Sequence, residues 1–436
     1  MTADTLAAAP HMLDVGALPT LGDYGYAGGR QSFHAFCRRV FAPGGPRFLR
    51  SADGALAVFR HADVRALAAA PDMSTLAPAV MFPGLLEDPA QSAGRPGFAV
   101  ADLIKNQLFT SNAPLNPALR RVLLNQVGPR PVATHADRTR AIAAELLAGL
   151  PIGEPVDFVG RFAEPLIGRY WGGLLDMPDD EAVAAAVEAR RMSPMLNLAP
   201  KPEARAGIDA AARAYRGLVE GAGDRALAKG DCPFVAGIAR DLAAIDIADD
   251  LGHGGFVPKS AGAFLAGNLF DGFHTAALAV ANTLYVLAQR PHVLAALRRS
   301  PEKIAAAVSE SLRLEPPVIQ LNRLTTAEVA YDDVIIPQGV QVMVMWGVGN
   351  QDPAAFPDPE RFDLDRPQQG VTTFGGGAHI CPGRFVASLA ARCMVETVIA
   401  SGLQVSLASD EDHWLPGSVM SQLAQLPVVL TKAAAT

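Results

Sequence analysis

A short segment near position 380 combines residue types that could hold a metal. Segment 374–384 reads FGGGAHICPGR, with His379, Cys381 and Pro382 following a run of glycines. Glycine lets backbone approach a flat ligand closely. Cys381 lies just before a predicted helix, whose N-terminus favours a thiolate over a thiol. A thiolate in a preformed loop is a suitable metal ligand, and Pro382 fits the first turn of the helix.

Three other interpretations of this segment stay open on the residues alone. A lone buried cysteine often acts only as a small hydrophobic residue. A nucleophilic cysteine needs a positioned base, and His379, two residues earlier, is poorly placed for that role. A phosphate-binding loop would require the pattern G-x-x-x-x-G-K-[ST], which the segment lacks.

A second group of polar residues lies in an apolar stretch. Between Lys259 and Arg290 the only charged residue is Asp271. Asp271, His274 and Thr275 are spaced i, i+3 and i+4 and share one helix face. The stretch also contains polar residues that are costly in lipid, which favours a helix through a large core over a membrane span. The three side chains predict a functional cavity; the alternative is a Thr275 hydroxyl bonded to the carbonyl of residue 271 and a satisfied core histidine.

Helical elements must position both groups. Alanine-rich stretches with apolar residues at helical spacing predict a mainly helical region over about 115–315. Strand and turn signals predict β-rich portions at about 45–65 and 318–380, and a last helix follows Pro382. No βαβ alternation is present. We expect a mainly α fold with a minor β region, forming a single domain over residues 1–436.

The composition excludes several classes of protein. The 436 residues include 37 basic and 44 acidic ones, a formal net charge of −7, which argues against nucleic acid as a partner. Four scattered cysteines do not form a disulfide scaffold or a zinc ribbon. The first 20 residues lack a basic cluster and a long apolar run. We expect a cytoplasmic protein that does not bind a membrane.

Segment 374–384 resembles the haem loop of the cytochrome P450 family, the haem-thiolate monooxygenases. That loop reads F-x-x-G-x-[HR]-x-C-x-G, and Phe374, Gly377, His379, Cys381 and Gly383 fill every fixed place. The resemblance, which covers about residues 110–430, implies haem b with Cys381 as the axial thiolate on iron. It also implies the single-domain P450 fold around a buried haem.

Two further motifs agree with the family in order and spacing. Glu310 and Arg313 form an E-x-x-R pair 68 residues before Cys381. In the family this is a buried structural pair behind the haem, completed by an arginine of the P-E-R-F segment, here Arg361. Thr275 precedes Glu310 by 35 residues, a spacing similar to that of the family's oxygen-activating threonine.

The resemblance also assigns haem contacts. Arg323, His379 and Arg120 are implied ligands of the propionates, since arginine binds carboxylate bidentately. Asn116 stands where many bacterial relatives have a histidine, and its amide can still donate a hydrogen bond. The remaining implied cofactor contacts are Gly272, Phe374, Gly375, Gly377, Gly383 and Ala387.

The oxygen-side helix departs from the family pattern of a small residue, glycine, any residue, an acid and threonine. Here His274 replaces the acid, and Asp271 occupies the small-residue position. One hypothesis makes His274 the proton relay before Thr275, with Asp271 as its partner or as an alternative carboxylate. A second makes Asp271 a substrate contact for a hydroxyl or a cationic nitrogen. In a third hypothesis the proton relay does not function, and the protein carries out other haem chemistry.

The resemblance implies a monooxygenase that inserts one atom of O2 into a lipophilic small molecule. No flavin or reductase domain fits in the chain, so electrons are expected from a ferredoxin and its reductase, which would dock on a basic patch containing Arg121, Arg384 and Arg392. Segment 74–106 is expected to fold over the substrate pocket. The expected pocket residues are Gly267, Phe270, Asp271, Ile319 and Met420. Alternatives are a haem-thiolate peroxygenase, dehydratase or nitric oxide reductase, and a non-enzymatic binding or sensor protein.

Overall fold

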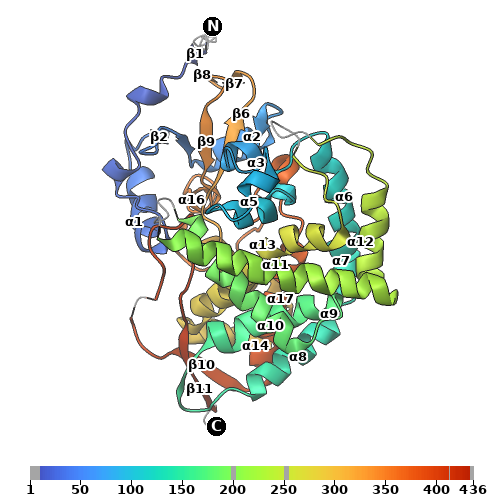
Figure 1. Ribbon diagram of the computed structural model, residues 1–436. Coiled ribbons are helices and arrows are strands. Elements are labelled where there is room, and N and C mark those ends of the chain that lie inside the picture. The colour runs from blue at the N-terminus through green and yellow to red at the C-terminus, as the bar shows by residue number, and fades with distance from the viewer. Residues whose placement is uncertain (1–9, 198–202, 250–254, 412, 433–436) are drawn as a thin grey trace.

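A computed structural model describes residues 10–197, 203–249, 255–411 and 413–432 (Figure 1). Helices dominate this part of the chain, as the alanine-rich periodicity predicts. The helices are α1 (Arg30–Val40), α2 (His61–Ala69), α3 (Pro78–Met81), α4 (Pro89–Ser92), α5 (Phe98–Ile104), α6 (Leu115–Val127), α7 (Pro129–Ala133), α8 (Ala136–Ala148), α9 (Glu164–Leu174), α10 (Asp179–Arg191), α11 (Ala204–Lys229), α12 (Pro233–Ala243), α13 (Ala261–Ala288), α14 (Pro291–Arg299), α15 (Ile304–Leu314), α16 (Trp346–Gly349) and α17 (Arg384–Ala400).

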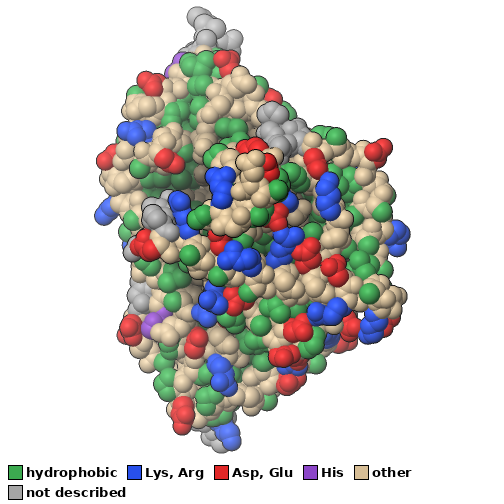
Figure 2. Space-filling model, in the orientation of Figure 1, with side chains coloured by type: hydrophobic (Ala, Val, Ile, Leu, Met, Phe, Trp, Pro, Cys, Tyr) green, Lys and Arg blue, Asp and Glu red, His purple; other side chains and the backbone are tan. Residues whose placement is uncertain are grey.

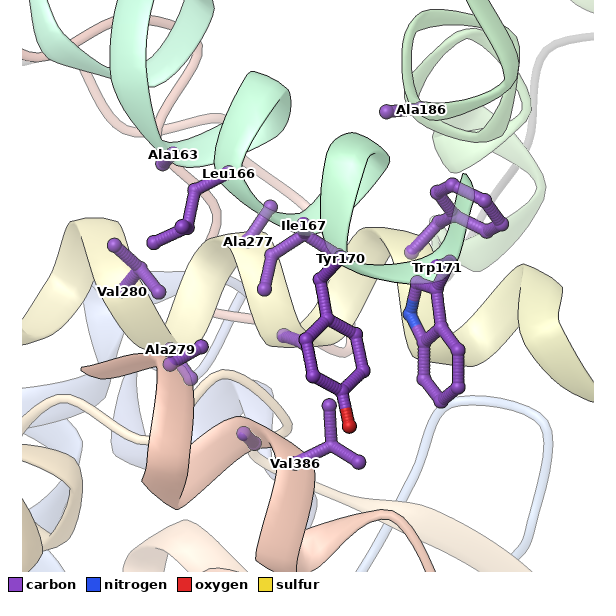
Figure 3. Packing of buried hydrophobic residues seen from close by; sticks show 14 of the residues in the cluster. Ala163, Leu166, Ile167, Tyr170, Trp171, Ala186, Ala277, Ala279, Val280 and Val386 are labelled. Carbon is purple, nitrogen blue, oxygen red and sulfur yellow. The ribbon is translucent and has the colours of Figure 1, made fainter. Parts of the chain in front are cut away.

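Helix α13 is the central element. It begins where the Ser260 hydroxyl accepts a hydrogen bond from the amide of Ala263, and nearly all its residues are buried. It packs against α9, α11, α15 and α17. Figure 3 shows α9 laid along α13, with Leu166 and Ile167 facing Ala277 and Val280 across the interface. In the described residues, no helix meets the length and apolarity of a membrane crossing.

The strands form three small sheets. They are β1 (His11–Met12), β2 (Phe48–Arg50), β3 (Leu56–Val58), β4 (Met73–Ser74), β5 (Pro155–Asp157), β6 (Leu321–Thr325), β7 (Val329–Tyr331), β8 (Val334–Ile336), β9 (Gln341–Val344), β10 (Leu403–Leu407) and β11 (Pro427–Lys432). The largest sheet has the order β2-β3-β9-β6-β4. This sheet joins strands that are far apart in sequence, as the blue and orange strands of Figure 1 show. The predicted strand region at 318–380 is narrower in the structure, because β9 ends at Val344.

The antiparallel pairing of β6 with β9 fixes the position of Arg323, one of the predicted site residues. Arg323 of β6 lies opposite Val342 of β9. After β9 the chain runs through α16 and a long coil to the loop before α17. In that loop the amide of Cys381 donates to the carbonyl of Phe374 at 2.9 Å, which closes the loop around the sulfur. Helix α17 begins three residues after Cys381.

A buried ion-pair cluster lies behind this loop. Arg313 donates from Nε and Nη2 to the two carboxylate oxygens of Glu310, at 2.8 and 2.9 Å. Arg366 donates from Nε to the same carboxylate at 3.0 Å. The prediction that Arg361 completes the cluster is wrong, because its side chain is exposed and pairs with Asp363. Instead the coil folds back so that the Arg361 carbonyl accepts from Arg366.

Candidate active site

A cavity of about 780 Å³ lies between α13, α5, α6 and the loop before α17. Its walls are largely aliphatic and aromatic. Fourteen of the predicted site residues line it: Arg120, Phe270, Asp271, Gly272, His274, Thr275, Arg323, Phe374, Gly375, His379, Cys381, Gly383, Ala387 and Met420. Segment 74–106 also contributes to the wall, through Met81, Phe82, Val100 and Ile104 among others.

Two predicted pocket residues lie outside the cavity wall. Gly267 faces the α5 side, where its carbonyl accepts from Gln107 at 2.9 Å. Ile319 is fully buried in a separate cluster with α1. In each case a neighbouring residue lines the cavity instead, Asn268 on α13 and Val318 before β6. The prediction was wrong by one residue, which on a helix or an extended segment turns the side chain to another face.

Gly377 and Asn116 also lie outside the wall, in supporting positions. Gly377 has a φ of +62°, and a Cβ there would come within 2.1 Å of the Ala68 carbonyl oxygen, so only glycine fits against α2. Asn116 donates from Nδ2 to the carbonyls of Leu108 and Ser111, at 3.1 Å each. The same Nδ2 lies 3.4 Å from Nδ1 of His379. Asn116 therefore orients His379 and does not reach the cavity itself.

Three nitrogen-bearing side chains converge at one end of the cavity without a counter-charge. Burial lowers the pKa of Arg323 to about 10, and its guanidinium donates to a backbone carbonyl. Nε of Arg120 is buried without a hydrogen-bond partner. Burial, Arg323 and Arg120 together lower the pKa of His379 to about 3. No carboxylate in the described ranges pairs with these groups, so this end of the cavity suits a ligand with anionic groups.

Cys381 lines the cavity near this cationic end. It forms no disulfide. Burial raises the pKa of its thiol, and the Gly383 amide opposes that rise by favouring the thiolate. Arg384 fixes the loop by donating from Nη1 to the Cys381 carbonyl at 2.7 Å. The sulfur is therefore held in a preformed loop and can serve as a metal ligand.

Helix α13 brings the second predicted group to the opposite wall. The Thr275 hydroxyl donates to the backbone carbonyl of Asp271 at 2.7 Å. Burial lowers the pKa of His274 to about 4, although the Gln422 amide opposes this, so its imidazole is neutral at neutral pH. Burial raises the pKa of Asp271 to about 7. In the part of the chain that the structure covers, neither a hydrogen bond nor an ion pair joins Asp271 to His274.

Trp346 is a wall residue that sequence reasoning missed. Its ring is 2% exposed, and its indole Nε1 is buried without a partner. The ring packs under the glycines of the cysteine loop, about 3.8 Å from the Cβ position of Gly375. An isolated tryptophan after a strand carries no spacing signal, so only the fold could reveal it.

The comparisons with known proteins agree with this geometry. The family model for cytochrome P450 matches residues 242–414. Cytochrome P450 107B1 of Saccharopolyspora erythraea is 31% identical over 342 residues, covering 78% of this chain and 80% of that protein. The 6-deoxyerythronolide B hydroxylase of the same organism is 30% identical over 335 residues, covering 76% and 80%. The solved structure of epothilone D-bound cytochrome P450epoK covers 94% of this chain and 98% of its own, with 19% identity and a TM-score of 0.78.

The chain belongs to the cytochrome P450 family. It has the single-domain P450 fold and is an oxidoreductase of the monooxygenase type, as its relatives named as hydroxylases are. The family implies a haem-thiolate cofactor. The residues present fit that group, because a cysteine loop and unpaired basic side chains line the same apolar cavity.

Proposed function

We propose that this protein is a haem b monooxygenase that inserts one atom of O2 into a lipophilic small molecule, using electrons from a separate ferredoxin-type partner. The observation that carries the proposal is the cationic end of the cavity. Arg120, Arg323 and His379 meet there beside the thiol of Cys381, and no carboxylate among the described residues pairs with them. Two carboxylates on a flat apolar ligand would neutralise the arginines and leave the ligand's body in the apolar part of the cavity.

The residues that would hold the haem follow from this arrangement. Cys381 supplies the thiolate, and Arg120 and Arg323 bind the propionates, with His379 beside them held by Asn116. The unpaired indole N–H of Trp346 is a further donor at this end of the cavity. When bound, the haem supplies the O2 chemistry of the reaction.

Thr275 is the side chain we propose to handle protons on the oxygen side. Its hydroxyl donates to the Asp271 carbonyl, so its oxygen lone pairs are free to accept a hydrogen bond from a water in the cavity. His274 does not fit the expected role of a proton donor at neutral pH, because burial keeps it neutral. The hypothesis of a His274–Asp271 pair also lacks a contact between the two side chains.

A lipophilic substrate is supported by the wall that faces α13. Segment 81–109 contributes Met81, Phe82, Leu85 and Phe109, and α6 contributes Leu123. Relatives act on large apolar molecules according to their names, among them the C-19 steroid 1alpha-hydroxylase of Sorangium cellulosum. Burial of such a substrate contributes about 25 cal/mol per Å² of apolar surface.

The proposed electron donor would approach the surface near the cysteine loop. Of the three predicted basic residues, Arg384 bonds the Cys381 carbonyl and lies over Phe385, and Arg392 lies 3.6 Å from Glu396. Arg121 is exposed on α6. It is therefore the predicted patch residue that is best placed to attract an acidic partner.

Turnover under ¹⁸O2 tests the proposal. The purified protein is given a ferredoxin, its reductase and NADPH, with a panel of lipophilic substrates, and the product is analysed by mass spectrometry. We expect one ¹⁸O atom per product and no turnover without ferredoxin. A product formed from hydrogen peroxide alone, or one without oxygen from O2, would instead support the peroxygenase or dehydratase type of chemistry. Thr275→Ala should raise the hydrogen peroxide released per electron consumed.

A further inference from the structure

Asp271, which is partly exposed to the cavity, differs from the buried carboxylates of this protein. Its side chain borders the cavity from α13, and no donor in the described residues contacts its carboxylate oxygens; only its backbone carbonyl accepts, from Thr275. Glu315, in contrast, is paired with Arg30 and His34. Asp209, another carboxylate in the cavity wall, accepts from the amides of Gly97 and Val100.

The charged and titratable groups around Asp271 supply no positive charge. Tyr215 packs against α13 from α11, and its hydroxyl is neutral because burial raises its pKa well above the ordinary value. Cys381 lies across the cavity, where Asp271 raises the pKa of its thiol. His274, one turn along α13, is neutral. Three arginines line the cavity: Arg120 and Arg323 lie at the end where His379 lies, and Arg205 lies on α11. None of them shifts the pKa of the Asp271 carboxyl group.

The cavity wall also contains aromatic side chains, which suit an alkylated cation. Trp171, Phe82 and Phe109 line the same cavity, and aromatic faces attract ammonium groups. On the face shown in Figure 2, acidic and basic side chains are interspersed over α11, so neither sign of charge dominates there. Asp271 instead offers a carboxyl group inside the cavity.

We propose that the substrate is a lipophilic amine, protonated when bound, whose ammonium group pairs with the Asp271 carboxylate. A buried carboxylate without a partner is costly, and a cation offsets that cost more fully than a neutral hydroxyl does. Protonation also occupies the nitrogen lone pair, which keeps the amine from acting as a metal ligand. The inference rests on the proposed function, since it names the substrate class of that same cavity.

A matched pair of probes tests the charge directly. The probes are 4-phenylbutyltrimethylammonium and its neutral carbon isostere 5,5-dimethylhexylbenzene, which differ only in N⁺ against C. Calorimetry and competitive dialysis at pH 8 give the dissociation constant of each probe for the haem-loaded protein and for Asp271→Asn. The measured quantity is the ratio of the two constants. We expect Asp271→Asn to shift this ratio at least about tenfold against the cation while binding the neutral probe as before.

Two further variants separate charge from structure. Asp271→Glu should keep most of the preference for the cation. Asp209→Asn should change the ratio less than about threefold, because backbone amides already occupy that carboxylate. A ratio that is unchanged in Asp271→Asn, or that shifts equally in Asp209→Asn, would overturn the inference.

Failure of the amine proposal can be told apart from failure of the proposed monooxygenase function. Thiolate ligation is read from the carbon monoxide spectrum of the same preparations. A normal spectrum with an unchanged ratio overturns the amine proposal alone. If the spectrum shows no thiolate ligation, the proposed function fails, and the binding ratio still decides whether Asp271 selects a cation.

Discussion

Two buried regions of this protein treat charge in opposite ways. Behind the cysteine loop, the carboxylate of Glu310 is bound by both Arg313 and Arg366, and their remaining N–H groups reach backbone carbonyls. In the cavity, Arg323 and Asp271 have no ionic partner among the described residues. The first region satisfies its charges within the chain and serves the fold. The second leaves its charges for ligands, which is how the structure marks a functional site.

Loss of Arg366 should have the largest effect. Arg366→Ala removes one partner of a buried carboxylate and three donations to the carbonyls of residues 357, 358 and 361. We expect a loss of about 3–5 kcal/mol in the free energy of unfolding, measured by urea denaturation. The matched control is Arg361→Ala, which breaks an exposed pair and should cost under about 1 kcal/mol. Equal losses would contradict the assignment of Arg366 to the cluster.

The Glu310 cluster also shows what the sequence could and could not predict. The E-x-x-R spacing places Glu310 and Arg313 one helical turn apart, and the resemblance to the P450 family implies that the pair is buried. Their third partner comes from irregular coil, where no period relates position to direction, and Arg361 was chosen in place of Arg366. Cys381 was found because a long loop motif surrounds it.

Part of the cavity wall was predicted, namely the oxygen-side face of α13 and the cysteine loop. Asp271, His274 and Thr275 were placed on a common face by helical spacing. Ile319 and Gly267 were wrong because neighbouring residues point to different faces, and the starting face depends on tertiary packing. Trp346 gave no signal, since its role comes from packing under the Gly375 loop.

The pH dependence of stability should be the next largest effect. The pKa of Asp271 is raised to about 7 in the folded protein, against about 4 in an unfolded chain. Between these values the folded state binds more protons, so Asp271 lowers the free energy of unfolding as pH rises, by up to about 1.4 kcal/mol per pH unit. The loss is complete above pH 7.

Asp271→Asn isolates this contribution. His274 has the opposite sign, because its lowered pKa of about 4 makes stability fall as pH decreases below its unfolded value. Both proteins retain His274, so the difference between them reports Asp271. In haem-free protein, the variant should gain stability relative to the wild type between pH 5 and pH 8. A pH-independent difference would show that the carboxylate has a partner in solution.

Substitution of Arg323 should weaken haem binding without lowering the stability of the haem-free protein, in contrast to substitutions in the Glu310 cluster. Arg323→Leu removes a buried charge without an ionic partner, so the haem-free protein should lose little or no stability. Haem binding should weaken at least about tenfold, because a propionate loses its charged donor. Haem transfer to apomyoglobin measures this affinity. Unchanged affinity with reduced stability would place Arg323 among the structural charges.

Asn116 should have the smallest effect. Asn116→Ala removes the amide that contacts His379, and haem affinity should fall about two- to tenfold, the value of one hydrogen bond. Asn125→Ala on the same helix breaks an exposed bond to Asp241 and serves as the control. An equal effect of the two variants on haem transfer would remove Asn116 from the site.

The absorption spectrum of the reduced protein under carbon monoxide tests the central claim most directly. The account predicts a strongly red-shifted Soret band in the wild-type protein, because the Cys381 thiolate is the axial ligand. Cys381→Ala should lose this band while Cys393→Ala, a buried cysteine outside the cavity wall, retains it. A shifted band in Cys381→Ala, or a wild-type protein that binds no haem, would contradict the account.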